Sequence, residues 1–293
     1  MFRMKGVIPP MITPFTKEGD LDVPGLRTLV RYLREQVDGL FICGSYGAGA
    51  LMSLEERKTV AEVTIQETAG KIPVIVMVGT TNNRDSIDLA KHAKEAGAAA
   101  VAAVGPYYFK HNAGDLEDFY TDLIESVDLP VYLYDNPGFQ GYEISCDTIA
   151  RLKKKGLAGV KDATFNILTY ARNERLLKDE TFDLALGTEA MWLSARVLGC
   201  EAFIPGIANA FPEICRKMFR EGMEGHYEAC RETQFKVNQM RDIMYLAKST
   251  QLAIYAMLEI RGILTCYPRK PFVPATETEK ENIRQALKEQ GMV

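Results

Sequence analysis

The sequence predicts a (β/α)8 TIM barrel with a C-terminal helical appendage. Short apolar segments and amphipathic segments alternate eight times over residues 1–222, and no strand-like segment follows. Apolar strands separated by helices favour a parallel sheet covered by helices, and eight such units close into a barrel. We therefore expect a barrel domain over 1–222 and a helical region over 223–293. A doubly wound sheet is the alternative, but it usually has fewer units, and no Gly-x-Gly-x-x-Gly follows the first expected strand.

The expected strands are short, apolar and bounded by turn residues. Pro9 and Pro10 interrupt the first of them, and Pro14 closes it. The eight strands are expected at 7–13, 40–43, 73–78, 98–104, 130–134, 157–164, 182–186 and 201–204.

The expected helices carry recognisable start signals. Asp22 precedes a helix with Pro24 in its first turn, and Ser53 with Glu56 forms a capping-box pattern. The barrel helices are expected at 22–36, from 53 onward, and at 83–96, 115–126, 145–154, 166–177, 189–198 and 211–221. The C-terminal helices are expected near 225–247, 250–262 and 278–290.

Composition excludes several classes of protein. The chain of 293 residues has a formal net charge of −4, which argues against nucleic acid as a partner. It has no apolar run of transmembrane length and no signal-peptide pattern, so we expect no membrane and a cytoplasmic location. Six cysteines without Cys-x-x-Cys spacing are expected to be reduced, and the three histidines have no partner at metal-ligand spacing. We therefore expect no metal site built by the protein.

Lys161 ends the sixth expected strand, which is otherwise almost wholly apolar. An ammonium group is costly to bury, and burial lowers the pKa of a lysine. The neutral amine that results can attack a carbonyl carbon. A solvated surface charge is the alternative interpretation of this lysine.

The carboxyl ends of the other strands supply possible partners, because the active site of such a barrel lies there. Tyr134 ends the fifth strand, beside Lys161, and its hydroxyl can move protons. A glycine-rich turn at 44–49 follows the second strand, and backbone N–H groups in such a turn can bind a carboxylate. Together these features indicate Schiff-base chemistry on a 2-oxo acid.

The same residues resemble the pyruvate-dependent class I aldolase family that includes dihydrodipicolinate synthase and N-acetylneuraminate lyase. The resemblance extends over essentially the whole chain. The matching segments are Pro-Pro-Met-Ile-Thr-Pro-Phe at 9–15, Gly-Ser-Tyr-Gly at 44–47, Glu-Glu-Arg at 55–57, Pro-Tyr-Tyr at 106–108, Tyr-Asp-Asn-Pro at 134–137 and Gly-Val-Lys-Asp at 159–162.

The resemblance implies a role for each matching residue. Lys161 would form the Schiff base with pyruvate, and Tyr134 would carry protons. Ser45 would link Tyr134 to Tyr108, which would reach into the site of a neighbouring subunit. The family implies a homotetramer built as a dimer of dimers, with pyruvate and an aldehyde as substrates. It also implies that neither a metal nor an organic cofactor is needed, because the lysine is the electron sink. The residues expected to contact the substrate are Ser45, Tyr46, Gly47, Phe139, Glu189 and Ile207.

The chain departs from the family pattern at the rim of this site. Tyr46 stands where a second small hydroxyl residue is usual, and Ala48 replaces a glutamate. Phe139 stands where dihydrodipicolinate synthase has an arginine, which argues against aspartate semialdehyde as the second substrate. Glu189 retains one carboxylate of the pair that the sialic acid lyase uses for sugar hydroxyls, although it could instead cap the following helix.

The expected function is a lyase that makes or cleaves a C–C bond between pyruvate and an aldehyde. Dihydrodipicolinate synthase activity proper and 2-oxo-acid dehydration or hydration are the alternatives within the family. A protein that only binds a 2-oxo acid is a further alternative, although mere binding requires neither a nucleophile nor a proton relay.

Overall fold

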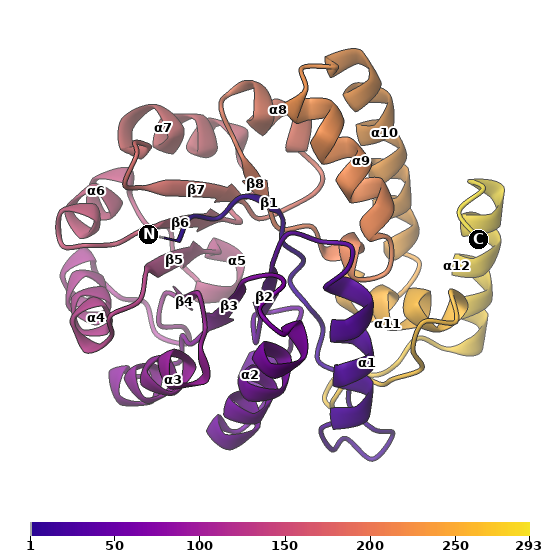
Figure 1. Ribbon diagram of the computed structural model, residues 1–293, viewed down its shortest axis with the longest axis horizontal. Coiled ribbons are helices and arrows are strands. Elements are labelled where there is room, and N and C mark those ends of the chain that lie inside the picture. Colours follow the sequence, from indigo (N-terminus) through magenta and orange to yellow (C-terminus); the bar gives the residue numbers. More distant parts are fainter. Residues whose placement is uncertain (1) are drawn as a thin grey trace.

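A computed structural model describes residues 2–293, and it confirms the predicted barrel (Figure 1). All the strands of one eight-stranded sheet run parallel, in the order β1-β8-β7-β6-β5-β4-β3-β2. The strands are β1 (Gly6–Val7), β2 (Leu40–Ile42), β3 (Val74–Met77), β4 (Ala100–Val104), β5 (Val131–Asp135), β6 (Gly159–Asp162), β7 (Asp183–Leu186) and β8 (Ala202–Phe203).

The barrel closes between the first two strands through the segment that follows β1. The backbone N–H of Met11 donates to the carbonyl of Phe41 at 2.9 Å, and the N–H of Phe41 donates to the carbonyl of Pro9 at 3.1 Å. The prediction of one strand over 7–13 is too long, because the regular ladder of β1 ends at Val7. The two prolines that follow have no N–H to donate, so only an isolated bridge between Pro10 and Phe41 remains.

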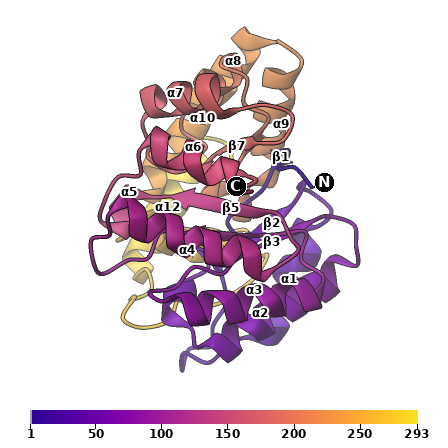
Figure 2. The ribbon, with the colours of Figure 1, turned by 90° about the vertical axis from the view of Figure 1, so that its left-hand side faces the viewer.

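Helices surround the barrel on its outer side (Figures 1 and 2). The helices that accompany the strands are α1 (Val23–Leu33), α2 (Leu54–Thr68), α3 (Asn83–Ala96), α4 (Ala113–Ser126), α5 (Pro137–Gln140), α6 (Cys146–Lys154), α7 (Ile167–Leu177), α8 (Trp192–Val197) and α9 (Pro212–Met223). Short 3-10 turns lie at η1 (Gly49–Leu51) and η2 (Gly206–Asn209).

Two helix starts and one short helix differ from the sequence prediction. The helix α4 begins before Asp115, because the side chain of Asn112 caps it in a capping box with that aspartate. The helix α8 begins at Trp192 rather than at Glu189. The single turn of α5 was not predicted, since four residues containing a proline and a glycine give no helical periodicity.

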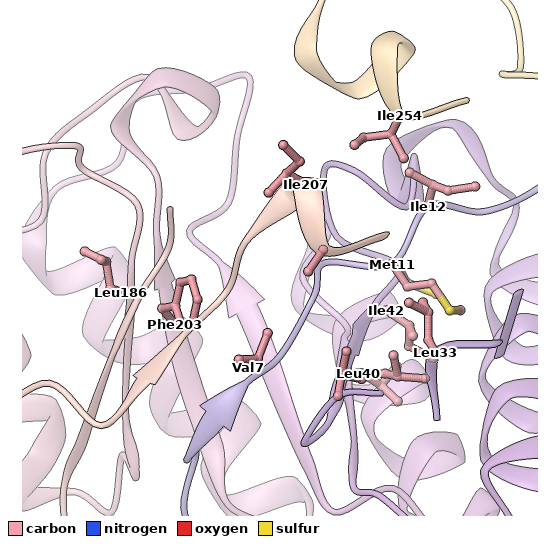
Figure 3. Packing of buried hydrophobic residues seen from close by; sticks show 14 of the residues in the cluster. Val7, Met11, Ile12, Leu33, Leu40, Ile42, Leu186, Phe203, Ile207 and Ile254 are labelled. Carbon is pink, nitrogen blue, oxygen red and sulfur yellow. The ribbon is translucent and has the colours of Figure 1, made fainter. Parts of the chain in front are cut away.

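Two apolar layers hold the barrel together. The inner layer fills the barrel with side chains such as Ile8, Phe41 and Tyr132. The outer layer lies between the strands and the helices, and Figure 3 shows part of it around Val7 and Phe203. Alternation of side chains along each strand therefore sends every second residue into the barrel.

The C-terminal helices pack against one flank of the barrel (Figure 1). They are α10 (Tyr227–Met244), α11 (Thr250–Ile260) and α12 (Glu277–Glu289). The hydroxyl of Tyr255 in α11 donates to the carbonyl of Thr13 at 2.8 Å, and Lys280 in α12 pairs with Glu259 in α11 at 2.8 Å. Within residues 2–293, every helix is too short or too polar to cross a membrane.

Candidate active site

A cavity of about 530 Å³ lies at the carboxyl ends of the strands, with walls from both the barrel and the C-terminal helices. The barrel side includes Ser45, Tyr134 and Lys161, and the C-terminal side includes Arg241 and Phe272. The other lining residues are Pro10, Tyr46, Asn136, Pro137, Gly138, Phe139, Ala163, Thr164, Phe165, Gly187, Thr188, Glu189, Ile204, Gly206, Ser249, Thr250 and Gln251.

Lys161 lies at the base of this cavity and is only 3% exposed. It sits in β6 in register with Tyr134 of β5, so both side chains enter the barrel interior. Burial lowers the pKa of the amine from 10.5 to about 7. A substantial fraction of Lys161 is therefore neutral at physiological pH, as a nucleophilic amine must be.

Two aromatic rings lie against the Lys161 amine. Its Nζ lies 3.8 Å from the ring centroid of Tyr134 and 3.9 Å from that of Phe41. Aromatic faces attract cations, so these two rings offset part of the cost of a positive charge at this buried nitrogen.

The hydroxyl of Tyr134 lies within a small hydrogen-bonded group. It lies 3.2 Å from the Oγ of Ser45, and the side-chain amide of Asn136 donates to it at 2.9 Å. Burial raises the pKa of Tyr134, and the hydrogen bonds from Ser45 and Asn136 partly oppose that rise. The phenol is therefore protonated at rest and has one neighbour, Ser45, with which it can exchange a proton.

The turn at 44–49 contributes two residues, Ser45 and Tyr46, to the lining of the cavity. Cys43 and Ala48 adopt left-handed conformations with φ of 58° and 53°, which bend the chain sharply. A side chain at Gly49 would meet the carbonyl oxygen of Cys43, so this position requires glycine. Within residues 2–293, the N–H groups of Ser45 and Tyr46 donate to no protein acceptor. They remain available for an anion.

Tyr46 crosses the mouth of the barrel and joins it to α11. Its hydroxyl donates to the Oγ1 of Thr250 at 2.9 Å, and its carbonyl accepts from the side chain of Gln251 at 2.9 Å. Its ring lies so close to Gly206 that a Cβ there would sit 2.5 Å from the ring. The bulk of Tyr46 is thus accommodated by a glycine after β8.

Glu189 follows β7 and is only 1% exposed. Its Oε2 accepts from the backbone N–H of Gly206 at 2.9 Å, and its Oε1 pairs with the Nη1 of Arg241 at 2.6 Å. The interpretation of Glu189 as a helix cap is wrong, since α8 begins at Trp192 with Met191 at its N-cap. The carboxylate instead binds the loop after β8 and holds a cation from α10.

Three predicted site residues lie outside the cavity lining. Ile207 is fully buried in the outer apolar layer (Figure 3), and Gly47 packs against the barrel mouth, where its carbonyl accepts from Thr13. Tyr108 is 87% exposed with φ of 80°, and its ring meets Phe109 edge-on. By contrast, Phe139 lines the rim while remaining 65% exposed.

Sequence reasoning missed the contribution of the C-terminal region to the cavity. The lining residues Arg241, Thr250, Gln251 and Phe272 all follow residue 222. No strand is expected there, so the placement of active sites at the carboxyl ends of strands gives no signal. Asn136 belongs to the Tyr-Asp-Asn-Pro segment at 134–137, and its position directly after β5 was the available signal. Among residues 2–293, no group of three or more His, Cys, Asp or Glu side chains is arranged to hold a metal ion.

Comparison with known proteins agrees with this geometry. The profile of the Dihydrodipicolinate synthetase family matches residues 3–290. A 4-hydroxy-tetrahydrodipicolinate synthase from Methanospirillum hungatei is 33% identical over 287 residues, which cover 97% of this chain and 98% of that protein.

Solved structures give the same result. YagE, a prophage protein of the dihydrodipicolinic acid synthase family from E. coli solved in complex with pyruvate, superposes with a TM-score of 0.94 at 26% identity, covering 99% of both chains. CdNal from Clostridium difficile, solved in complex with mannosamine, superposes with a TM-score of 0.93 at 26% identity, covering 99% of this chain and all of that one. The family resemblance predicted from the sequence motifs is confirmed.

Proposed function

The chain belongs to the Dihydrodipicolinate synthetase family and is a pyruvate-dependent lyase of the class I aldolase type, and we propose that its chemistry proceeds through an imine on Lys161. The observation that carries this proposal is the burial of Lys161 at the base of the cavity, with an amine pKa of about 7. Such an amine is both present in neutral form and close to a proton carrier.

The reaction begins when the neutral Nζ of Lys161 attacks C2 of pyruvate. Tyr134 donates a proton to the departing oxygen, so that the carbinolamine loses water and a protonated imine forms. The Tyr134 phenolate then removes a proton from C3, and the electrons of that C–H bond move toward the imine nitrogen, which gives an enamine. The enamine carbon attacks the aldehyde carbonyl, whose oxygen takes that proton back from Tyr134, and the nitrogen becomes a protonated imine again. Water then hydrolyses the imine and frees Lys161; cleavage runs the same steps backwards.

The turn after β2 is the proposed carboxylate site. The unpaired N–H groups of Ser45 and Tyr46 supply donors, and the side chain of Ser45 also contacts the hydroxyl of Tyr134 at 3.2 Å. Holding the carboxylate here would set C2 above the Lys161 amine. Orientation of this kind is a large part of the rate that an enzyme supplies. We propose no metal or organic cofactor, because the protonated imine itself withdraws the electrons.

We also propose that the active unit is an oligomer in which Tyr108 acts in the site of a neighbouring subunit. The exposure of Tyr108 and Phe109 on one loop supports this, since two adjacent aromatic side chains in water favour a protein contact. A homotetramer built from two dimers is the proposed assembly, and the cytoplasm is the proposed location.

Dihydrodipicolinate synthase activity proper is a second candidate, favoured by the named activity of the Methanospirillum hungatei relative. Phe139 opposes it, because an apolar ring occupies the rim where a cation would attract a second carboxylate. Dehydration or hydration of a sugar-derived oxo acid would use the same imine. Its products distinguish it from C–C bond cleavage. Cleavage releases pyruvate and an aldehyde, whereas dehydration keeps the carbon chain whole.

Borohydride trapping tests the proposal directly. Native protein incubated with pyruvate and borohydride is expected to gain a reduced pyruvyl group on the peptide that contains Lys161. Lys161→Met should abolish the adduct, whereas Lys154→Met, which alters an exposed lysine on α6, should leave it unchanged. Absence of the mass on Lys161, while a known aldolase is labelled in parallel, would refute the mechanism. Binding of pyruvate without the adduct would instead indicate a non-catalytic binder.

A further inference from the structure

Three charged side chains line the cavity among the residues that the structure describes. They are Lys161 at the base, Glu189 after β7 and Arg241 from α10. Only Arg241 is a permanent cation, so an anionic group on the second substrate would have to find its partner there.

Arg241 is already neutralised by a buried carboxylate. Its Nη1 lies 2.6 Å from the Oε1 of Glu189, and the side chain of Glu189 has almost no contact with water. Burial is the largest single influence on the pKa of Arg241 and lowers it, but the charge and the hydrogen bond of Glu189, with smaller contributions from Tyr245 and Tyr46, together raise it. Withdrawing Arg241 from this pair would leave a carboxylate buried without its counter-ion, which is strongly unfavourable.

In the imine mechanism proposed above, on which this inference rests, the charges of the reacting complex also cancel. The protonated imine on Lys161 carries one positive charge, and the carboxylate of pyruvate carries one negative charge. With Glu189 balancing Arg241, no cation in the lining is left for a phosphate or a second carboxylate. An anionic tail would therefore be desolvated without compensation.

The groups around the pair are suited to hydroxyl groups instead. Arg241 uses one N–H on Glu189 and another on the hydroxyl of Tyr245 at 3.3 Å, out of the five that a guanidinium offers. Ser249 and Thr250 accept hydrogen bonds from Leu252 and Tyr46, and within residues 2–293 neither hydroxyl donates one. Donors and acceptors thus alternate along this wall without net charge.

We propose that the cavity selects an uncharged polyhydroxy aldehyde as the second substrate, and that Arg241, neutralised by Glu189, is a specificity-determining residue that donates to substrate hydroxyls. The pair recognises hydroxyl oxygens while rejecting anions. Selectivity of this kind combines matched hydrogen bonds for one substrate with uncompensated charge for its rival.

Matched aldehydes test the proposal on the native enzyme. Condensation with pyruvate is measured for the neutral aldehydes glyceraldehyde and erythrose, and for the anionic aldehydes glyceraldehyde 3-phosphate and succinic semialdehyde. We expect kcat/KM for the better neutral aldehyde to exceed that for either anionic one by at least about tenfold. Equal or higher kcat/KM for an anionic aldehyde overturns the proposal, and so does an enzyme that turns over neither neutral aldehyde.

Glu189→Gln tests the role of the pair. The amide can still accept from Gly206 but no longer neutralises Arg241, so the anionic-to-neutral ratio of kcat/KM should rise about tenfold or more. An unchanged ratio in a variant that melts like the native protein overturns the assignment. Glu62→Gln, at an exposed pair with His92, is the matched control and should not alter the ratio. If borohydride leaves Lys161 unlabelled in these preparations, the imine mechanism fails; if Lys161 is labelled but anions are preferred, only the specificity proposal fails.

Discussion

Asp135 and Asp162 lie opposite each other at the ends of β5 and β6, and both carboxyl groups are buried. The side-chain amide of Gln140 donates to one Asp135 oxygen at 3.0 Å, whereas Asp162 accepts from the backbone and hydroxyl of Thr164. Burial, and next the charge of Asp162, raises the pKa of Asp135 from 3.8 to about 7. The pair therefore retains a proton near neutral pH, on the outer side of the strands that carry Tyr134 and Lys161.

Asp135→Asn is expected to stabilise the protein at high pH. Between the unfolded pKa of 3.8 and the folded value of about 7, only the folded state holds the Asp135 proton, so native stability falls as pH rises through this window. Asparagine removes that loss, and the free energy of unfolding should rise by on the order of 2 kcal/mol at pH 8 with little change at pH 4. Urea unfolding at both pH values measures this. Asp128→Asn, at an exposed carboxylate, is the control. An equal gain at both pH values would contradict the prediction.

The rate of imine formation should increase with pH around neutrality. Only the neutral amine of Lys161 attacks pyruvate, and burial places its pKa at about 7. Below that value the amine is protonated and the rate should fall about tenfold for each pH unit. Borohydride trapping after short incubation over pH 5.5 to 9 gives the profile. A profile that keeps rising without a bend up to pH 9 would show that the amine retains an ordinary pKa.

Tyr134→Phe should distinguish the contribution of the Tyr134 hydroxyl to turnover from that of its ring. The phenylalanine ring still lies under the Lys161 amine, while the proton carrier is lost. We expect kcat to fall about 10²- to 10⁴-fold, and stability to change little. Steady-state kinetics and thermal unfolding provide both readouts. Tyr32→Phe, whose hydroxyl lies outside the cavity near the carbonyl of Ala210, is the control for removal of a tyrosine hydroxyl. Native turnover in Tyr134→Phe would exclude this hydroxyl from proton transfer.

Gly206→Ala should destabilise the protein through Tyr46. The added methyl group would lie 2.5 Å from the Tyr46 ring, which is partly buried against the core and whose hydroxyl is hydrogen-bonded to Thr250. Overpacking of this kind costs about 1–3 kcal/mol. Tyr46→Ser removes the ring, so the same alanine should cost much less in that background. A double-mutant cycle by urea unfolding measures the difference. Additive effects would mean that the two residues do not interact.

Mixing two inactive variants tests whether Tyr108 acts between subunits. Tyr108→Phe keeps Lys161, and Lys161→Met keeps Tyr108, so a mixed pair contains one complete site. Coexpression should restore roughly a quarter of native activity if subunits pair at random. Native mass spectrometry confirms that the mixed species form. Mixed species without activity would show that Tyr108 is not shared in this way.

Periodicity and strand ends were enough to predict the barrel and the centre of its site. Lys161 and Tyr134 were predictable because each lies next to the last residue of a buried strand, and the fold brings such ends to one face. The same rule applied one residue further would have found Asp135 and Asp162, which directly follow the two catalytic candidates. The division of the chain at residue 222 stays a prediction, as do the individual roles of the site residues.

The cavity wall from α10 and α11 could not be predicted in the same way. Arg241 lies within a long amphipathic helix, where one arginine resembles any other until packing brings it to Glu189. The contact of Tyr46 with Thr250 joins residues 204 positions apart in sequence, and local pattern carries no information about such pairs. Tertiary packing, rather than local secondary-structure propensity, therefore determines the Glu189–Arg241 and Tyr46–Thr250 contacts.

The Tyr46–Thr250 contact has a consequence for how this enzyme can diverge. Residues proposed for bond chemistry are encoded before position 222, whereas Arg241, Thr250 and Phe272 are encoded after it. Recombination that exchanged the last quarter of the coding sequence with that of a homologue would leave the reactive centre intact and replace part of the wall facing the aldehyde. Such chimeras would need a compatible residue at position 46, because the Tyr46 side chain is hydrogen-bonded to a residue of the exchanged part.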